Sequence, residues 1–409
     1  MCLYRPFFDK WQSPTILSLL AFIMVLPIFE TPKTIFLWLF IVFSGISIWR
    51  HKDKFRWYAD DSLLVVWMFS GFAVALFAGI HHKEWGGATG VLTLAFFFLV
   101  LKNIELSERL RWVIALVVLV STLLATGEGL WQTFVIKQHK ALELNSVGHV
   151  NHSAIYLVLN FALALAMTMT LKKSASLAAK VFVVFCLLLT AGCIVLSNSR
   201  ASALTMVVIA LTFGLIWLKR SKWPLLVISL SIATAFAGLY FENATVVGKH
   251  IRKTSHGEVL GERQAIWNSS LLVWRHFPWF GLGIKNFDQA TEELQTQWLA
   301  EEGKTFVKGQ YLPYAHAHNF YLSTLAEQGL FGFSIIMLIL GRIGYLLYKH
   351  RPWLADTDLY WCSWLAALGA VEVVLVNGLF NTTLHHEHGL FALLLIGMWW
   401  SSLSQRVQG

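Results

Sequence analysis

The chain has 409 residues, of which 56% are hydrophobic and only 13% are charged. A soluble globular domain carries about a quarter charged residues, so this composition excludes an ordinary soluble protein. The formal net charge of +9 gathers in alternate loops between apolar blocks, which indicates membrane topology and gives no support to nucleic-acid binding.

Apolar blocks long enough to cross a bilayer recur along the chain. A spanning helix needs about 20 mostly apolar residues. We therefore predict an all-α, polytopic membrane protein with about twelve transmembrane helices, near residues 15–29, 32–49, 62–80, 86–101, 112–136, 153–171, 178–197, 201–218, 223–241, 319–347, 358–380 and 389–403. In the fourth block Gly86, Gly87 and Gly90 predict a break at its start.

The basic residues orient these helices. Lys and Arg are frequent in one set of alternate loops, whereas the short connections of the other set hold only Lys33, Lys83, Lys137, Lys140 and Arg200. The positive-inside rule makes the first set cytoplasmic and places both termini inside. The chain then divides into helices 1–9 (residues 1–241), one long external loop with amphipathic helices (242–317), and helices 10–12 (318–409).

Histidine and aspartate are distributed unequally between the two sides. Only His51 and His350 fall on the cytoplasmic side, and Asp288 is the one aspartate on the outer side. A divalent metal would need paired carboxylates. An outer face rich in imidazole and guanidinium therefore suits an anionic substrate held without a metal.

Arg200 lies in Ser197-Asn198-Ser199-Arg200-Ala201-Ser202, at the outer start of a predicted span. An arginine at this depth is costly unless it is paired or faces a polar cavity. It could extend to the lipid headgroups. It could also bind an anion with the free N–H groups of a helix N-terminus.

Arg263 begins a run in which Trp267, Leu271 and Trp274 recur at helical spacing. This spacing predicts an amphipathic helix at the outer interface, ended by Pro278 and the glycines that follow. Arg263 could bind an anion, or it could pair with Glu262 or Glu258.

His318 lies in Tyr314-Ala315-His316-Ala317-His318-Asn319, where the external loop meets the next span. The N-terminus of a helix disfavours imidazolium, so a neutral His318 able to accept a proton is expected. A capping or interfacial role is the alternative. His316 could equally be the base, and the sequence does not choose between them.

Several further polar residues are candidates with weaker patterns. Lys83, beside His81, His82 and Glu84, could be a third phosphate contact. His385-His386-Glu387-His388 is interpreted as a polar interfacial turn in preference to a metal site, because adjacent residues do not converge as helical i, i+4 ligands do. Residues on another outer turn, His149, Asn151 and His152, could line an acceptor cleft. The roles of Glu327 and Glu372, carboxylates within spans, stay open.

His318-Asn319, nine further residues and Gly329-Leu330-Phe331-Gly332 together resemble the signature of the bacterial O-antigen ligase family. The resemblance extends to Ser-Arg-Ala at Arg200, and to Arg-x3-Trp followed by Pro-x2-Gly-x-Gly between Arg263 and Gly283. The span count, the inside termini and the long loop before the signature agree with it. O-antigen polymerases and O-linked oligosaccharyltransferases belong to the same superfamily.

The resemblance implies a GT-C-like glycosyltransferase in a Gram-negative inner membrane, with a periplasmic active site and no cofactor. The donor would be an O-antigen polysaccharide on undecaprenyl pyrophosphate, and the acceptor a sugar hydroxyl of lipid A–core oligosaccharide. Arg200 and Arg263 would bind the pyrophosphate, and His318 would act on the acceptor hydroxyl. Lys83, His316 and Asn319 are the further expected substrate contacts, and direct displacement would invert the anomeric carbon.

Three other functions are compatible with parts of this pattern. A lipid-linked sugar transporter would hold its substrate near the midplane, often between internal repeats, and neither feature is visible here. A polymerase or a protein O-oligosaccharyltransferase would share the motifs, although the protein-modifying members tend to be longer. The sequence determines neither the sugars nor their linkage nor the oligomeric state.

Overall fold

The computed structural model describes residues 12–50, 57–139, 141–172, 174–218, 229, 262–353 and 356–408. Within these ranges the regular elements are all helical. They are α1 (Gln12–Val25), α2 (Glu30–Arg50), α3 (Ala59–Leu76), α4 (Glu84–Asn103), α5 (Glu108–Leu130), η1 (Trp131–Val135), α6 (Val150–Thr170), α7 (Leu177–Leu196), α8 (Arg200–Trp217), α10 (Arg263–His276), η2 (Phe287–Gln289), α11 (Glu292–Glu301), α12 (Phe320–Lys349), α13 (Asp358–Glu372), η3 (Val373–Asn377) and α14 (His386–Gln408).

The chain is a multi-pass membrane protein. Its described residues contain nine helices long and apolar enough to cross a bilayer: α2 to α8, α12 and α13, with η1 and η3 continuing α5 and α13. The helix α1 is shorter, and α14 begins with three polar residues. The predicted block 223–241 lies outside the described residues, so the total of twelve spans stays a prediction.

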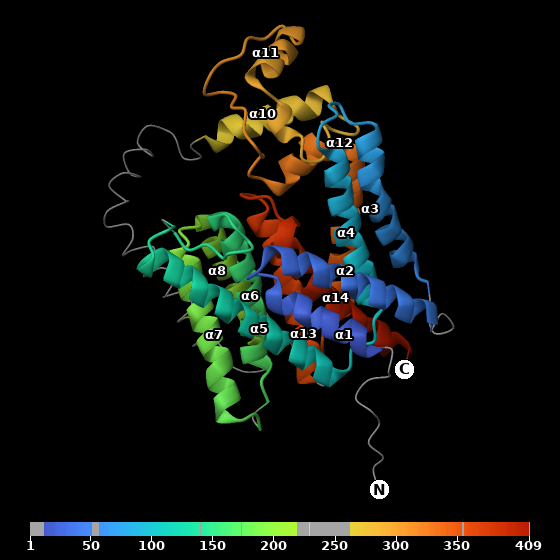
Figure 1. The fold of residues 1–409 in the computed structure, drawn as a ribbon, viewed down its shortest axis with the longest axis vertical. Helices are drawn as coiled ribbons and strands as arrows, with labels where there is room; N and C mark the ends of the chain where they lie inside the picture. Colours follow the sequence, from blue (N-terminus) through green and yellow to red (C-terminus); the bar gives the residue numbers. More distant parts are fainter. Residues whose placement is uncertain are drawn as a thin grey trace.

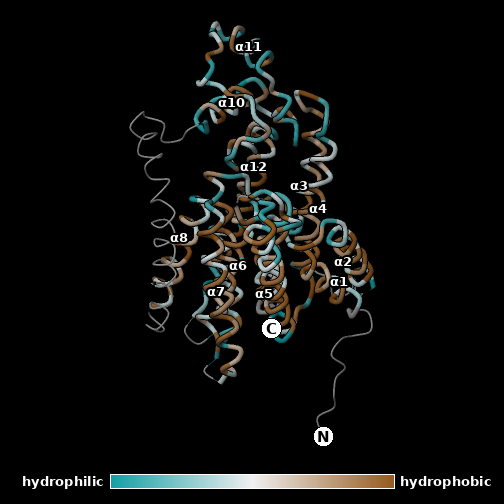
Figure 2. Tube along the Cα trace, turned by 60° about the vertical axis from the view of Figure 1, so that its left-hand side comes forward, coloured by the Kyte–Doolittle hydropathy of each residue, from teal (hydrophilic) through white to brown (hydrophobic). Residues whose placement is uncertain are grey.

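The helix α6 forms the centre of the bundle. Its spanning window is entirely buried, and it contacts α5, α7, α8, α13 and α14 (Figure 1). A helix that is apolar on all sides suits such a position. Figure 2 shows hydrophobic residues along the bundle, whereas hydrophilic residues are frequent toward α10 and α11, which project from one end of it.

The glycines near the start of α4 do not break it, and our prediction of a break there was wrong. The helix begins at Glu84 and continues through all three glycines. A Cβ on Gly87 would lie 2.5 Å from the side chain of Ile284, and one on Gly71 of α3 would lie 2.9 Å from the backbone of Ala88. These glycines therefore permit close packing of α4.

Two ion pairs at the start of α3 attach it to α4 and α12. Lys102 Nζ lies 2.7 Å from Asp61 Oδ1, with both side chains almost fully buried. Arg342 Nε donates to Asp60 Oδ1 at 2.7 Å. Charges in a membrane bundle are costly unless they are paired, so these pairs specify which helices lie beside α3.

The long helix α12 is broken at Gly329, whose φ of 60° and ψ of −167° are not helical. Residues 278–283 fill the break and replace the hydrogen bonds that α12 loses there. The backbone N–H groups of Leu330 and Phe331 donate to the carbonyls of Pro278 and Trp279, at 2.8 and 3.0 Å. In return, the N–H groups of Leu282 and Gly283 donate to carbonyls of α12 at 2.8 and 3.0 Å.

The glycines of both motifs make this close approach possible. A Cβ on Gly329 would lie 2.3 Å from the carbonyl of Trp279, and a Cβ on Gly281 would lie 2.4 Å from the backbone of Glu327. On its other side, the inserted segment accepts a hydrogen bond from the N–H of Gly79 at 3.0 Å. The two glycine-containing motifs of the sequence are thus parts of one backbone contact.

We predict that Gly329→Ala lowers the thermal midpoint in detergent by several degrees, because the new Cβ adds both overpacking and φ strain, together worth about 2 kcal/mol or more. Thermal unfolding followed by tryptophan fluorescence measures the effect. The matched control is Gly341→Ala in the same helix, where a Cβ meets nothing within 4 Å. Equal midpoints for the two variants would contradict the proposed contact.

Candidate active site

The helix α10 places Arg263 at its first position. Ile266, Leu272 and Val273 are buried and pack in one cluster with Trp298 of α11. The predicted helix is present, and Leu271 of the apolar stripe expected at the outer interface is 37% exposed. Since α10 also contacts α12, Arg263 is held half-buried beside the membrane bundle.

Arg200 is the exposed first residue of α8. The turn before it is fixed by two buried serines, since the hydroxyl of Ser199 donates to that of Ser202 at 3.1 Å. Ser202 in turn accepts a hydrogen bond from the side-chain amide of Asn377 at 3.0 Å. The start of α8 is therefore attached to η3.

His318 immediately precedes α12 in a left-handed backbone conformation, with φ of 48°. The side-chain oxygen of Asn319 caps the helix by accepting from the N–H groups of Tyr321 and Leu322, at 2.9 and 3.0 Å. Its amide donates to the carbonyl of Leu379 at 3.0 Å. Asn319 thus positions His318, and its expected contact with substrate stays a prediction.

Residues 377–383, which begin at the last residue of the π-helical turn η3, contact the start of α8 and the start of α12. This segment binds Ser202 through Asn377 and Asn319 through the carbonyl of Leu379. In addition, the N–H of Phe320 donates to the carbonyl of Gly378 at 2.8 Å. Asn381 donates to the side chain of Asn377 at 2.9 Å. Our sequence reasoning missed both asparagines, although a buried amide inside an apolar span is itself a signal of function.

The structure places Arg263 within electrostatic range of both Arg200 and His318. Burial, and then the charge of Arg200, lower the pKa of Arg263. Burial also lowers the pKa of His318 to about 4, with further contributions from His316, Arg263 and His149. His318 is therefore neutral at pH 7, with a lone pair available to accept a proton.

The ion pair considered for Arg263 is not formed within the described residues. No described carboxylate, Glu262 included, pairs with it, and Glu258 lies outside the described part. The charge of Arg263, with the charge of Arg200 acting on it, creates a positive field. Such a field suits an anion, since planar guanidiniums match phosphate oxygens in bidentate contacts.

Histidines from three segments gather next to this field. The rings of His316 and His318 lie 4.2 Å apart between centroids. His152, in the first turn of α6, lies 5.7 Å from His386 and 5.1 Å from His388. His149, also expected near the acceptor, lies 5.8 Å from His152. Nowhere in the described ranges do three or more His, Cys, Asp or Glu side chains take positions suited to a metal ion.

Lys83 lies at the start of α4, and its ammonium donates to Asp288 Oδ2 at 2.7 Å. Its backbone N–H donates to Asn286 Oδ1 at 2.8 Å. The residue therefore connects the α3–α4 turn to the loop after α10. A phosphate contact by Lys83 stays a prediction, and the phosphate would compete with Asp288 for its ammonium.

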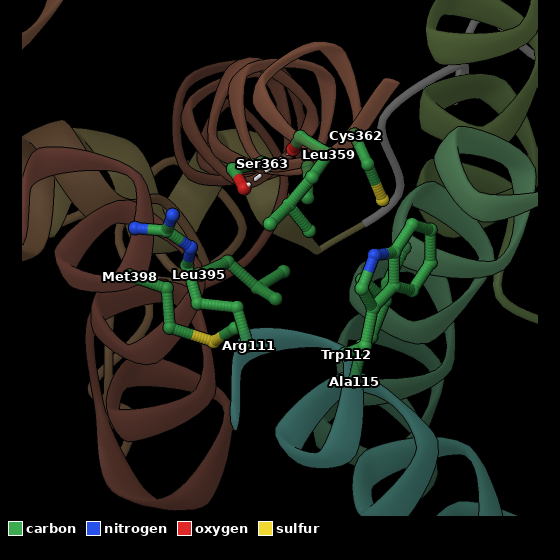
Figure 3. Close-up of a pocket in the computed structure, with 10 residues that line it drawn as sticks. Arg111, Trp112, Ala115, Leu359, Cys362, Ser363, Leu395 and Met398 are labelled. Carbon is green, nitrogen blue, oxygen red and sulfur yellow. Dashed lines mark hydrogen bonds between the residues drawn. The ribbon is translucent and has the colours of Figure 1, made fainter. Parts of the chain in front are cut away.

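A separate small pocket lies between α5, α6, α13 and α14, among residues near the predicted cytoplasmic ends of α5 and α13. Figure 3 shows Arg111 beside Ser363 and Met398, with Cys362 and Trp112 on the other side of the pocket. The rest of its lining is apolar. It contains none of the predicted site residues, so we do not place the active site there.

The family model of the O-antigen ligases matches residues 183–337. The matched range runs from α7 to the middle of α12 and contains Arg200, Arg263 and His318. This match confirms the resemblance predicted from the motifs over that part of the chain. No curated protein matches the chain.

We predict that the imidazole of His318 stays neutral down to about pH 4, well below the ordinary histidine pKa of about 6.5. Burial and the nearby positive groups both disfavour imidazolium, so the shift must be downward. Nuclear magnetic resonance of labelled histidine in detergent micelles measures it, with His318→Gln identifying the signal. A His318 signal that titrates near pH 6.5 would contradict the prediction.

Proposed function

We propose that this membrane protein is an O-antigen ligase. It transfers O-antigen polysaccharide from undecaprenyl pyrophosphate to a sugar hydroxyl of lipid A–core, at the periplasmic face of a Gram-negative inner membrane. The observation that carries the proposal is the convergence of Arg200, Arg263 and a neutral His318 within the range that matches the O-antigen ligase family. The expected architecture is GT-C-like, and transfer needs no metal.

The two arginines act on the leaving group. The acceptor oxygen forms a bond to the anomeric carbon while the bond from that carbon to the pyrophosphate oxygen breaks. Undecaprenyl pyrophosphate departs with the electron pair, and Arg200 and Arg263 neutralise the charge that develops on it. Such charge stabilisation by preorganised groups is typically among the largest contributions to catalysis. Single displacement inverts the anomeric configuration.

His318 removes the proton of the attacking hydroxyl. General-base catalysis typically contributes 10²–10⁴-fold. The groups facing this imidazole are Tyr314, His316, Arg263 and His149, which keep it neutral without supplying a competing carboxylate. The helix cap fixes Asn319, the residue directly after His318, so the base keeps its position when substrate binds.

The acceptor distinguishes the ligase from its relatives. The purified protein is given a lipid-linked donor together with lipid A–core, a second lipid-linked repeat unit, or a peptide with serine and threonine. We expect transfer to lipid A–core. Elongation of the lipid-linked unit would indicate a polymerase, and a glycopeptide would indicate a protein O-oligosaccharyltransferase. Donor movement across vesicles without a covalent product would indicate a transporter.

We predict that Arg200→Ala and Arg263→Ala each weaken donor binding at least tenfold, because each removes a charged contact to the pyrophosphate. Lysine at either position should restore little, since it lacks the planar fork. Binding of undecaprenyl pyrophosphate is measured together with thermal stability. Exposed Arg275, in the last turn of α10, is the control position. Wild-type affinity in both variants would reject the pyrophosphate clamp.

We predict that His318→Ala lowers the transfer rate at least 10²-fold while donor affinity largely survives, because the base is lost and the arginines remain. Rates and donor affinity are measured on the same preparations. His316→Ala is the matched control, two residues away with its ring 4.2 Å from that of His318. If His316→Ala is inactive and His318→Ala is nearly normal, then His316 is the base.

A further inference from the structure

Three rings at alternate positions of one short segment gather at the proposed base. The ring centroid of Tyr314 lies 5.2 Å from that of His318 and 5.8 Å from that of His316. The two imidazoles lie 4.2 Å apart. Ala317, between the two histidines, is instead buried in the apolar cluster that holds α10. The proposed reaction gives the histidines a role and leaves Tyr314 without one.

Tyr314 keeps much of its surface uncovered although it lies beside two other rings. The residue is 42% exposed. The ring of His318 is tilted by 45° to it and that of His316 by 72°, so neither imidazole stacks on it face to face. Within the described ranges no protein group forms a hydrogen bond with the tyrosine hydroxyl. The structure therefore leaves aromatic surface open directly beside the base.

The helix α10 holds the segment that carries Tyr314. The N–H of Leu312 donates to the hydroxyl of Ser269, in the middle of α10, at 3.0 Å. Ser269 is fully buried and donates in turn to Gln295 Oε1 at 2.8 Å. Because α10 begins with Arg263, the open aromatic surface and the proposed donor contact are attached to the same helix.

An aromatic surface in this position suits a sugar ring. The C–H groups on one face of a sugar are apolar and weakly positive, and they pack against the negative face of an aromatic ring. Carbon atoms in such contact lie about 3.5–4.0 Å apart. A sugar on Tyr314 would therefore lie beside His318, whose ring centroid is 5.2 Å away. Its hydroxyls would extend from the sugar edge toward the imidazole, which needs about 2.6–3.2 Å to the oxygen it deprotonates.

We propose that Tyr314 binds the acceptor by stacking against one of its sugar rings, which places a hydroxyl of that sugar at His318. The inference rests on the proposed function and assigns a residue that holds the acceptor. The aromatic ring of Tyr314, and not its hydroxyl, carries the contact. Because the contact is present in the bound acceptor and in the transition state alike, its loss changes KM more than kcat.

The test measures kcat and KM with lipid A–core as acceptor, using purified protein in detergent. Tyr314→Leu should raise the KM for acceptor about tenfold, a loss in the range of an aromatic stacking contact. Its kcat and its KM for donor should stay nearly unchanged. Tyr314→Phe and Tyr314→Trp keep an aromatic ring and should stay within about twofold of the wild-type KM. A rise confined to the KM for donor would place a donor sugar on the ring and overturn the proposal.

Trp279→Leu is the matched control. Trp279 is 66% exposed, is also predicted on the outer side, and belongs to the segment that fills the break in α12. Tyrosine and tryptophan are frequent at membrane interfaces, where they anchor a protein. Equal changes of the acceptor KM in both leucine variants would assign Tyr314 to such anchoring and overturn the proposal. A wild-type KM in Tyr314→Leu, or an equal loss in Tyr314→Phe, would also overturn it.

Binding of the soluble, deacylated core oligosaccharide separates this proposal from the ligase reaction. Tyr314→Leu should weaken that binding about tenfold, whereas Trp279→Leu should not. Transfer to lipid A–core together with equal binding by wild type and Tyr314→Leu would overturn the stacking and leave the ligase reaction intact. Elongation of a lipid-linked unit would reject the ligase but still supply a sugar acceptor, whose KM in the same variants decides the stacking. Transfer to a peptide would overturn both.

Discussion

The break in α12 at Gly329 is the constraint on which the candidate site depends. A helix interrupted inside a membrane protein must find new partners for its free N–H and C=O groups. The segment 278–283 supplies them on one side and contacts the α3–α4 turn on its other side. One exchange of backbone hydrogen bonds therefore fixes α10, which begins with Arg263, against α12, which follows His318.

A second shared anchor lies at residues 377–383. Chains of amide and hydroxyl groups there bind the start of α8 through Asn377 and the start of α12 through the carbonyl of Leu379. In low-dielectric surroundings an unpaired polar group raises the free energy of the folded state. A network in which every group has a partner is therefore rigid. The π-helical turn before it, η3, belongs to a class of distortion often found at functional sites. Arg200 and His318 thus depend on one turn for their relative positions.

The electrostatics around the candidate site depend on how the nearby carboxylates are paired. Acidic side chains are present, but Glu387, Asp288 and Glu327 are engaged by Lys33, Lys83 and backbone N–H groups respectively. Arg263 lies beside another guanidinium, and burial and that charge both lower its pKa. Groups of like charge held together by the fold are relieved when an anion binds between them. The negative charge of a bound substrate would therefore offset the repulsion between these two guanidiniums.

The sequence by itself determined the membrane class, the helices at eleven of the twelve predicted blocks, and the resemblance that the match to residues 183–337 confirmed. Apolar length and motif spacing are local properties, so they can be recognised without a fold. Only the tertiary structure decided that the glycines of two motifs meet and that Asn377 attaches the start of α8 to η3. Such contacts connect residues distant in sequence, and no local pattern encodes which side chains will meet.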